Sequence, residues 1–291
     1  MPPITRDERL VAVGRDVAVI RRVGKNLALL TSTAPAASEQ LERDGYAVLR
    51  AVFTRVDVAA LVAEIEETFE ERSAERNRTD RDEFRYQMLN HGPRSQEAVG
   101  HPAILELIEP LLGDDCHVIA NTAWRNPPAF PGGPWHCDAG PHVPRPEGVE
   151  WDERIPYPVF AIGCHVLLRD CPLACGPTAV VPGSHRSGRL PPSALRDDPE
   201  LSYDGRGPVA LTAEAGDVCL FVSDAWHRGT PSTADGTGRL FLQVHYGRRD
   251  IAQRLRPTAE VHQLTAAALE RAVTPRQRSL VGLHDPYFYD G

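Results

Sequence analysis

The sequence predicts a single, mainly β domain in which an N-terminal helical layer packs against a β-sandwich or jelly roll. Three observations support this fold class. Beyond residue 115, short β-rich runs are separated by Gly/Pro turns and do not alternate with helices. Between residues 39 and 112, apolar side chains recur at helical spacing. The chain has 291 residues, 42% of them hydrophobic, which is enough for one sizeable core without disulfides.

The helical layer, together with a first strand, is expected over residues 41–115. Ser38 would cap a short helix over residues 39–44 that Gly45 ends, and a strand over residues 46–50 would follow. A longer helix is expected from about residue 55 to 76, where one apolar stripe contains Val58, Leu61, Val62, Ile65 and Phe69. A further helix is expected over residues 102–112, with Gly113 at its end.

The jelly-roll core is expected over residues 116–250. Its strands are predicted at residues 116–123, 159–168, 178–181, 209–211, 218–222 and 239–246. Residues 1–40 are interpreted as an N-terminal extension that ends in an Ala/Ser/Pro-rich linker. Residues 251–291 are interpreted as a C-terminal extension with helical spacing near residues 265–273. All of these parts, residues 1–291, would form one domain.

The charge and hydropathy of the chain argue against two kinds of binding partner, nucleic acids and membranes. The chain has 32 basic and 40 acidic residues, a net charge of −8, whereas nucleic-acid binding and docking on anionic membranes require basic surfaces. The N-terminus lacks the basic-then-apolar layout of a secretory signal, and no run of about 18 apolar residues could span a membrane. We therefore expect a cytoplasmic protein that binds neither nucleic acid nor membranes. The sequence does not indicate its oligomeric state.

The six cysteines do not form the paired CxxC motifs of zinc knuckles. Cys171 and Cys175 lie four residues apart with Cys164 nearby, but this spacing fits zinc sites poorly. Reduced, mostly buried thiols are the favoured interpretation, and the sequence gives these three cysteines no further role.

The strongest local signal for chemistry is the segment Pro134-Trp135-His136-Cys137-Asp138. On an extended strand, residues i and i+2 point to the same side, so His136 and Asp138 can reach one metal ion. Two imidazoles and one carboxylate on one face of an octahedron leave three positions open, as in non-heme iron oxygenases. Among the 11 histidines, only His136 has an acidic residue at position +2.

His227 is the best candidate for the third ligand. A turn at Gly216-Asp217 leads into an apolar run, residues 218–222, that continues towards this histidine. Twelve residues later, Arg239 opens another strand. An inward-facing arginine at a strand start is costly unless it binds an anion, and a bidentate pair with a carboxylate is the natural solution. For an isolated arginine, a structural salt bridge would be the simpler interpretation.

Taken together, these segments resemble the phytanoyl-CoA dioxygenase family of iron(II)- and 2-oxoglutarate-dependent oxygenases. The resemblance runs from about residue 40 to 250. The matching pieces, in family order, are Asp44 to Leu49, Trp135 to Asp138, Gly176 to His185, Gly216 to His227, and Arg239.

The resemblance implies a double-stranded β-helix, a cupin-like jelly roll, with the metal at the mouth of the barrel. It implies that His136, Asp138 and His227 bind Fe(II) and that Arg239 binds the far carboxylate of the cosubstrate 2-oxoglutarate. Thr178, Thr230 and Asn121 are weaker candidates for cosubstrate contacts. The implied reaction uses O2 to hydroxylate a C–H bond of a small organic molecule, with release of succinate and CO2. Related halogenases lack a carboxylate at the position of Asp138, so its presence favours hydroxylation.

Substrate contacts are expected close to the first two ligands. Residues 139–158 form a long Pro-rich segment that would act as a lid or only cap the barrel, and its candidates for substrate contact are His142, Arg145 and Trp151. Tyr86 and Trp124 are further candidates for a pocket wall.

Two other function classes remain open at this point. A cupin-like isomerase or hydrolase could use the same three ligands with zinc or manganese, without 2-oxoglutarate. A non-catalytic binding module could keep the fold alone. Arg239 disfavours the first class, which needs no clamp for a dicarboxylate, and the intact set of ligands disfavours the second. The substrate stays open, whether free, CoA-linked or carrier-bound, as does hydroxylation against desaturation or another oxidation.

Overall fold

The computed structural model describes residues 36–71, 83–138, 140–152, 154–255 and 263–285, together with the course of four short strands nearer the N-terminus. These strands are β1 (Ala12–Val13), β2 (Asp16–Val17), β3 (Val19–Val23) and β4 (Asn26–Leu30), paired antiparallel as β1–β2 and β3–β4. Residues 31–35 of the expected linker and the expected helical residues 72–76 lie outside the described residues. Residues 36–38, also expected in the linker, are helical instead.

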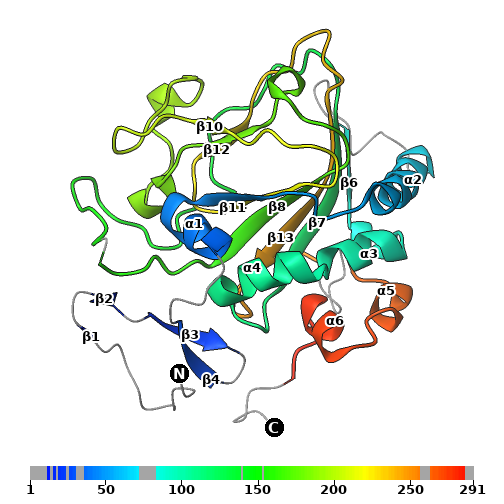
Figure 1. Ribbon diagram of the computed structural model, residues 1–291, viewed down its shortest axis with the longest axis horizontal. Helices are drawn as coiled ribbons and strands as arrows, with labels where there is room; N and C mark the ends of the chain where they lie inside the picture. Colours follow the sequence, from blue (N-terminus) through cyan, green and yellow to red (C-terminus); the bar gives the residue numbers. More distant parts are fainter. Residues whose placement is uncertain are drawn as a thin grey trace.

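Two antiparallel sheets form the core (Figure 1). The larger sheet has the strand order β5-β11-β8-β13-β7-β6. Its members are β5 (Tyr46–Leu49), β6 (Glu83–Tyr86), β7 (His117–Asn126), β8 (Ala161–Leu167), β11 (Val218–Val222) and β13 (Arg239–Gly247). The smaller sheet has the order β10-β9-β12 and contains β9 (Thr178–Val180), β10 (Val209–Ala210) and β12 (His227–Gly229). The predicted jelly roll is therefore confirmed.

Helices cover the outer face of the larger sheet. They are α1 (Ala36–Asp44), α2 (Arg55–Glu71), α3 (Pro93–Val99), α4 (Pro102–Leu112), α5 (Ala266–Glu270) and α6 (Pro275–Leu280). The helices expected in the N-terminal layer and near residue 265 are present, whereas α3, α6 and strand β6 were not predicted. No helix among the described residues is long and apolar enough to cross a bilayer.

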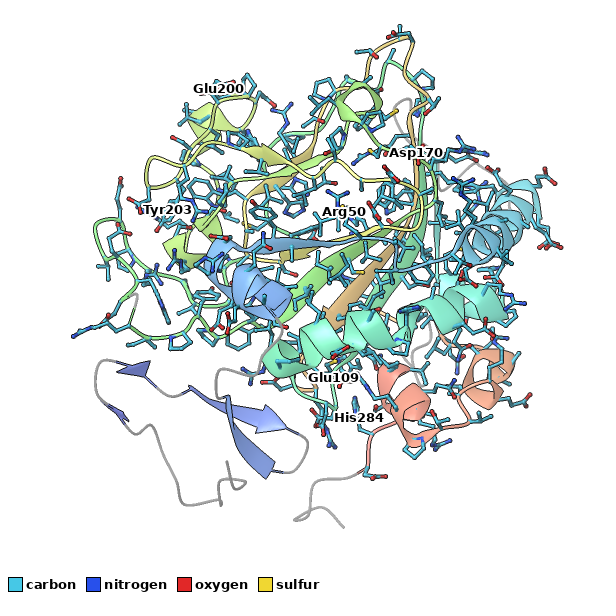
Figure 2. The ribbon with its side chains drawn as sticks, in the orientation of Figure 1. Arg50, Glu109, Asp170, Glu200, Tyr203 and His284 are labelled. Carbon is cyan, nitrogen blue, oxygen red and sulfur yellow. The ribbon has the colours of Figure 1, made fainter. Side chains whose placement is uncertain are left out.

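The helix expected over residues 39–44 starts earlier, at Ala36, so the prediction that Ser38 caps it was wrong. Ser38 is buried inside α1, and its hydroxyl donates to the Leu107 carbonyl of α4 at 2.7 Å. The side chain therefore joins two helices and does not cap one. The predicted turn before β11 is confirmed: Gly216 has a φ of +94°, and a Cβ there would lie 2.3 Å from the Phe53 carbonyl oxygen. The Asp217 carboxylate forms an ion pair with Arg50 at 2.7 Å (Arg50 is labelled in Figure 2).

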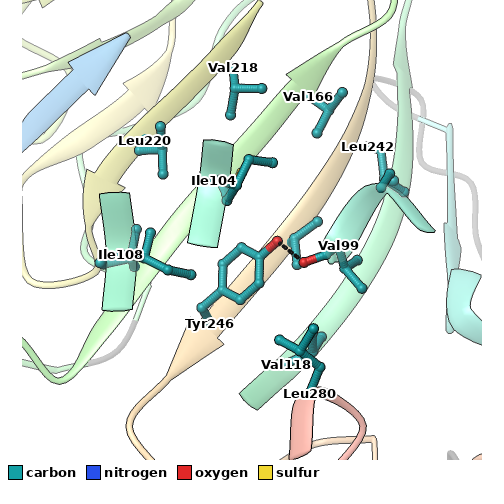
Figure 3. Close-up of a cluster of buried hydrophobic side chains, with 14 of the residues drawn as sticks. Val99, Ile104, Ile108, Val118, Val166, Val218, Leu220, Leu242, Tyr246 and Leu280 are labelled. Atoms are coloured by element: carbon teal, nitrogen blue, oxygen red, sulfur yellow. Dashed lines mark hydrogen bonds between the residues drawn. The ribbon is translucent and has the colours of Figure 1, made fainter. Parts of the chain in front are cut away.

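Alternation along the strands separates an apolar face from the site. On β13, every second side chain (Leu240, Leu242, Val244 and Tyr246) belongs to the same buried cluster as the helices (Figure 3). The Tyr246 hydroxyl donates to the Val99 carbonyl of α3 at 2.8 Å, so this polar group is satisfied inside the core. The intervening residues Arg239, Phe241, Gln243 and His245 therefore face the space between the two sheets.

Candidate metal centre and the two cavities beside it

The backbone brings His136, Asp138 and His227 together at one end of the barrel. His136 and His227 form an isolated antiparallel bridge, with N–H···O distances of 3.0 and 2.9 Å. Two residues further on, the Asp138 amide donates to the Ser223 carbonyl at 3.2 Å. His227 opens β12, so the smaller sheet fixes one candidate ligand and orients the segment that bears the other two.

The potential ligand atoms of these three residues all lie within 4.8 Å of one another. Asp138 Oδ1 lies 3.4 Å from His227 Nε2 and 3.9 Å from His136 Nε2. In the described part of the chain, this is the one group of at least three His, Cys, Asp or Glu residues with such spacing. The three buried cysteines Cys164, Cys171 and Cys175 form no such group.

Hydrogen bonds fix the two imidazole rings in the orientation that a metal requires. His136 Nδ1 lies 2.9 Å from the Pro134 carbonyl oxygen, and His227 Nδ1 lies 2.9 Å from the Ala225 carbonyl oxygen. Because a carbonyl can only accept, each Nδ1 carries the proton and each Nε2 keeps its lone pair. Both lone pairs belong to the nitrogens nearest Asp138.

The second oxygen of Asp138, Oδ2, is buried and has no hydrogen-bond partner. An orphaned buried carboxylate oxygen is costly unless a cation or donor compensates it. The neighbouring imidazoles, chiefly His227, hold the pKa of Asp138 well below its usual range although burial alone would raise it. Burial and then His227 lower the pKa of His136, which keeps this ring neutral. Asp138 in turn raises the pKa of His227, although burial alone would lower it. An ionised carboxylate beside two imidazoles is the donor set that suits Fe(II).

Next to the three residues lies a cavity of about 190 Å³, here called the inner cavity. Arg239 closes it. The residue is 7% exposed, and its guanidinium donates from Nε to Asn126 Oδ1 and from Nη1 to Thr178 Oγ1, both at 3.1 Å. It also lies 5.1 Å from the centroid of the Phe241 ring. Gly229 makes room for it, because a Cβ there would lie 2.8 Å from Arg239 Nη2.

A larger cavity of about 800 Å³, here called the outer cavity, meets the inner cavity at Asp138. Trp124 and Gln243 also line both, and Trp124 Nε1 donates to Gln243 Oε1 at 2.8 Å. The other walls of the outer cavity come from residues 86–87, strands β7 and β13, and the segment after β13: Tyr86, Gln87, Ala120, Asn121, Thr122, His245, Ala252, Gln253, Arg254 and Leu255.

The family model for phytanoyl-CoA dioxygenase (PhyH) matches residues 41–239, about two thirds of the chain. The chain belongs to the phytanoyl-CoA dioxygenase family. Two curated relatives, the ectoine dioxygenases of Bordetella parapertussis and Bordetella bronchiseptica, are each 27% identical over 218 residues. These residues cover 65% of this chain and 67% of either relative.

Solved structures share the fold of this family member. The non-heme α-ketoglutarate-dependent epimerase SnoN from nogalamycin biosynthesis has a TM-score of 0.57 at 20% identity and covers 73% of this chain and 82% of its own. The carbocyclase SnoK from the same biosynthesis has a TM-score of 0.55 at 20% identity, with coverages of 76% and 85%.

The predicted enzyme class is thereby confirmed: the chain is a non-heme iron, 2-oxoglutarate-dependent oxygenase. A cupin-like isomerase or hydrolase is not favoured.

The candidates for substrate contact in residues 139–158 are held by contacts within the protein. His142, Arg145 and Trp151 line neither cavity. The His142 ring and its backbone amide both bond to Asp224, which also accepts from the Tyr157 hydroxyl at 2.6 Å. The Arg145 guanidinium stacks over Trp151 at 5.1 Å from the ring centroid. Asp224 therefore fastens both ends of the loop to the segment that leads to His227.

Two of the weaker cosubstrate candidates also lie outside the inner cavity. The Thr230 hydroxyl donates to the Pro177 carbonyl at 2.7 Å. Asn121 lines the outer cavity, pairs with Val244 on the helix-facing side of the sheet, and donates to the Gln243 carbonyl at 3.0 Å. Thr178 does line the inner cavity, where it meets Arg239. Trp124 and Tyr86 both line the outer cavity.

Several site residues were missed by the sequence interpretation. Asn126, His165, Gln243 and His245 line one or both cavities. Period-two alternation from Arg239 could have found Gln243 and His245, because they share its face of β13. Asn126 and His165 lie on β7 and β8, and only the strand register places them beside Arg239 and Gln243.

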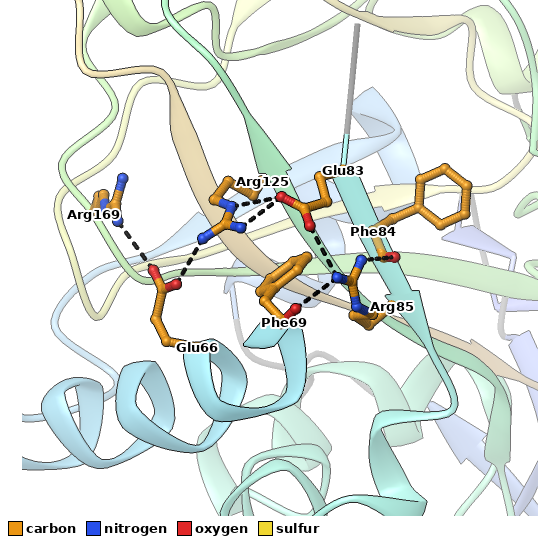
Figure 4. Close-up of polar contacts among 7 residues, drawn as sticks. All are labelled: Glu66, Phe69, Glu83, Phe84, Arg85, Arg125 and Arg169. Carbon is orange, nitrogen blue, oxygen red and sulfur yellow. Dashed lines mark hydrogen bonds and ion pairs between the residues drawn. The ribbon is translucent and has the colours of Figure 1, made fainter. Parts of the chain in front are cut away.

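An ion-pair network outside the cavities holds the wall of the outer cavity in place (Figure 4). Arg125 forms ion pairs with Glu83 of β6 and with Glu66 of α2, the latter at 2.7 Å. Arg85 pairs with the same Glu83 at 2.9 Å and donates to the Phe69 carbonyl at 2.8 Å. Because Arg125 follows Trp124 and Arg85 precedes Tyr86, the network fixes the two strands that bear these aromatic residues.

Proposed function

We propose that this enzyme hydroxylates a C–H bond of a small organic molecule. In this proposal, His136, Asp138 and His227 hold Fe(II), and Arg239 binds the far carboxylate of 2-oxoglutarate, whose oxidation by O2 yields succinate and CO2. The observation that carries the proposal is the orphaned oxygen of Asp138 within a two-histidine, one-carboxylate set beside a buried arginine.

Each protein group has a definable task. Bound iron would supply the oxidising chemistry, which no side chain here can supply. His136 and His227 offer Nε2 because the Pro134 and Ala225 carbonyls hold their Nδ1 protons. Asp138 brings a negative charge that partly neutralises the ion. The carbonyl bonds also keep the rings from rotating, so the site is rigid before the metal arrives.

Arg239 is suited to a carboxylate because its fork is already oriented by Asn126 and Thr178. The inner cavity is lined by the three metal-binding candidates at one side and by Arg239 at another, which suits a short dicarboxylate between them. Burial strengthens the pairing, because the effective dielectric constant is low there. The Thr178 hydroxyl would contribute an additional contact with the carboxylate.

The substrate would occupy the outer cavity, whose volume of about 800 Å³ suits a small molecule. Trp124 and Tyr86 would provide an aromatic wall. His142, Arg145 and Trp151 would affect substrate binding indirectly, through the loop that they stabilise. The relatives named as ectoine dioxygenases make ectoine the first compound to test, since they are similar over about two thirds of the chain.

The test is substrate-dependent formation of succinate. Protein with Fe(II), 2-oxoglutarate and O2 would be supplied with ectoine and a panel of small metabolites, and succinate and the hydroxylated product would be quantified. We expect equal amounts of both products with an accepted substrate. Product formation that needs no 2-oxoglutarate, or that persists in Asp138→Ala, would contradict the proposal.

A further inference from the structure

The charge of the outer cavity is unusual for this acidic protein. Among the described residues that line it, only Asp138 and Arg254 carry a full charge at neutral pH. Asp138 belongs to the proposed metal centre, where iron would compensate it. The remaining charge is the single cation Arg254, which interacts electrostatically with the buried His245 ring in the same cavity.

Two other arginines on the same segment differ from Arg254, because each has an acidic partner. Arg248 forms an ion pair with Asp250 at 2.9 Å, and Arg249 lies 3.7 Å from Asp115. Arg254, on the same segment after β13, has no hydrogen bond or ion pair from its side chain to any described residue. The arginine of the outer cavity is thus left available for a ligand.

The same cavity also offers an apolar surface, its aromatic wall. The Trp124 ring is held by its bond to Gln243, and the Phe84 ring packs 4.9 Å from Trp124 and 5.1 Å from Tyr86 between centroids. Rings fixed in this way offer contact area at little cost in conformational entropy.

Building on the proposed function, we propose that the substrate is a small anion, with a carboxylate or phosphate bound by Arg254 and an apolar part against Trp124 and Tyr86. A guanidinium binds either anion through parallel N–H···O bonds. The net charge of −8 repels anions from the protein as a whole. A cation without a carboxylate partner attracts them locally in spite of this repulsion. Neutral analogues would lack this pairing, so charge would be the main criterion for substrate selection.

The test compares ligands that differ in charge. Hippurate and its neutral amide, hippuramide, have the same aromatic ring and peptide group, and phenyl phosphate replaces the carboxylate by a phosphate. Binding to protein loaded anaerobically with Fe(II) and 2-oxoglutarate would be measured by calorimetry, so that the inner cavity is already filled. We expect hippurate or phenyl phosphate to bind at least about tenfold more tightly than hippuramide, as one charge-assisted pair predicts. The tighter anion identifies carboxylate or phosphate as the preferred group.

Variants assign the effect to one side chain. Arg254→Gln should abolish the preference for the anion, and Arg254→Lys should retain part of it. Arg248→Gln, which removes a paired arginine from the same segment, is the matched control and should retain the full preference. Circular dichroism would confirm that each variant is folded. Equal affinities for hippurate and hippuramide, no binding of either anion, or an unchanged preference in Arg254→Gln would overturn the inference.

Failure of the inference can be told apart from failure of the proposed function. The same loaded samples report on the cosubstrate, because Fe(II) and 2-oxoglutarate together should produce a visible absorption band. A normal band without anion preference would overturn the inference alone. No band in wild-type protein would contradict the proposed function and, with it, the inference.

Discussion

The two cavities hold their arginines in opposite ways. Arg239 in the inner cavity is buried, bonded to Asn126 and Thr178, and stacked on Phe241. Arg254 at the outer cavity is exposed, and its side chain forms no hydrogen bond or ion pair with a described residue. A guanidinium that is already held in place loses little conformational entropy when it binds a ligand, but it fits only one ligand shape. A guanidinium without such bonds can adapt to different ligands, at a cost in conformational entropy. The difference suits an invariant cosubstrate in the inner cavity and a separately selected substrate in the outer cavity.

The largest effect is expected where the cavities meet. Asp138→Ala removes the single carboxylate of the proposed metal centre, so it should abolish Fe(II) binding and measurable succinate formation with any substrate. Cys137→Ala is the matched control, because its thiol faces the Asp224 carbonyl at 3.3 Å and not the ligand group. Bound iron and succinate would be measured for both variants. Comparable loss in the two would mean that the fold, and not the carboxylate, was affected.

Arg239→Gln should raise the KM for 2-oxoglutarate by about 10- to 100-fold. This factor corresponds to the free energy of a charge-assisted hydrogen bond to a carboxylate. Affinity for a substrate in the outer cavity should change far less, because Arg239 does not line that cavity. Steady-state kinetics with each ligand varied in turn would separate the two constants. Equal changes in both would remove the distinction between an inner and an outer cavity.

Asn126→Ala tests whether orientation of the guanidinium matters. The variant leaves the charge of Arg239 in place but removes the acceptor of its Nε–H. We expect the KM for 2-oxoglutarate to rise by roughly fivefold, corresponding to about 1 kcal/mol for one hydrogen bond. Ser232→Ala, a nearby substitution outside the inner cavity, is the control. A KM unaffected by Asn126→Ala would mean that packing alone orients Arg239.

The burial of the inner cavity also predicts a dependence of stability on pH. Burial, and then Arg239, lower the pKa of His165 to about 3. Between about pH 6.5 and 3 the unfolded chain binds a proton at this histidine and the folded chain does not, so stability falls as the pH falls. His165→Asn should therefore lose about 2 kcal/mol less than wild type between pH 7 and pH 5. Denaturant titration with a metal chelator present would measure this, and equal losses would show that His165 is protonated in the folded protein.

Local and long-range signals explain which residues could be predicted. His136 and Asp138 are two apart on one extended segment, and His227 and Arg239 are associated with recognisable strands. The loop residue His142 was expected at the substrate because it lies near Asp138 in the sequence. Its bonds to Asp224, 82 residues away, hold it outside the lining of both cavities. Arg254 has no local signal at all, because only the fold brings the end of β13 to the outer cavity.

The central claim is that one site binds both iron and 2-oxoglutarate through His136, Asp138, His227 and Arg239. Anaerobic addition of Fe(II) and then 2-oxoglutarate, followed by visible absorption, tests it directly. We expect a new band that requires both additions, is absent in His136→Ala and is weakened in Arg239→Gln. No band, together with tight binding of zinc or manganese at the same residues, would contradict the account.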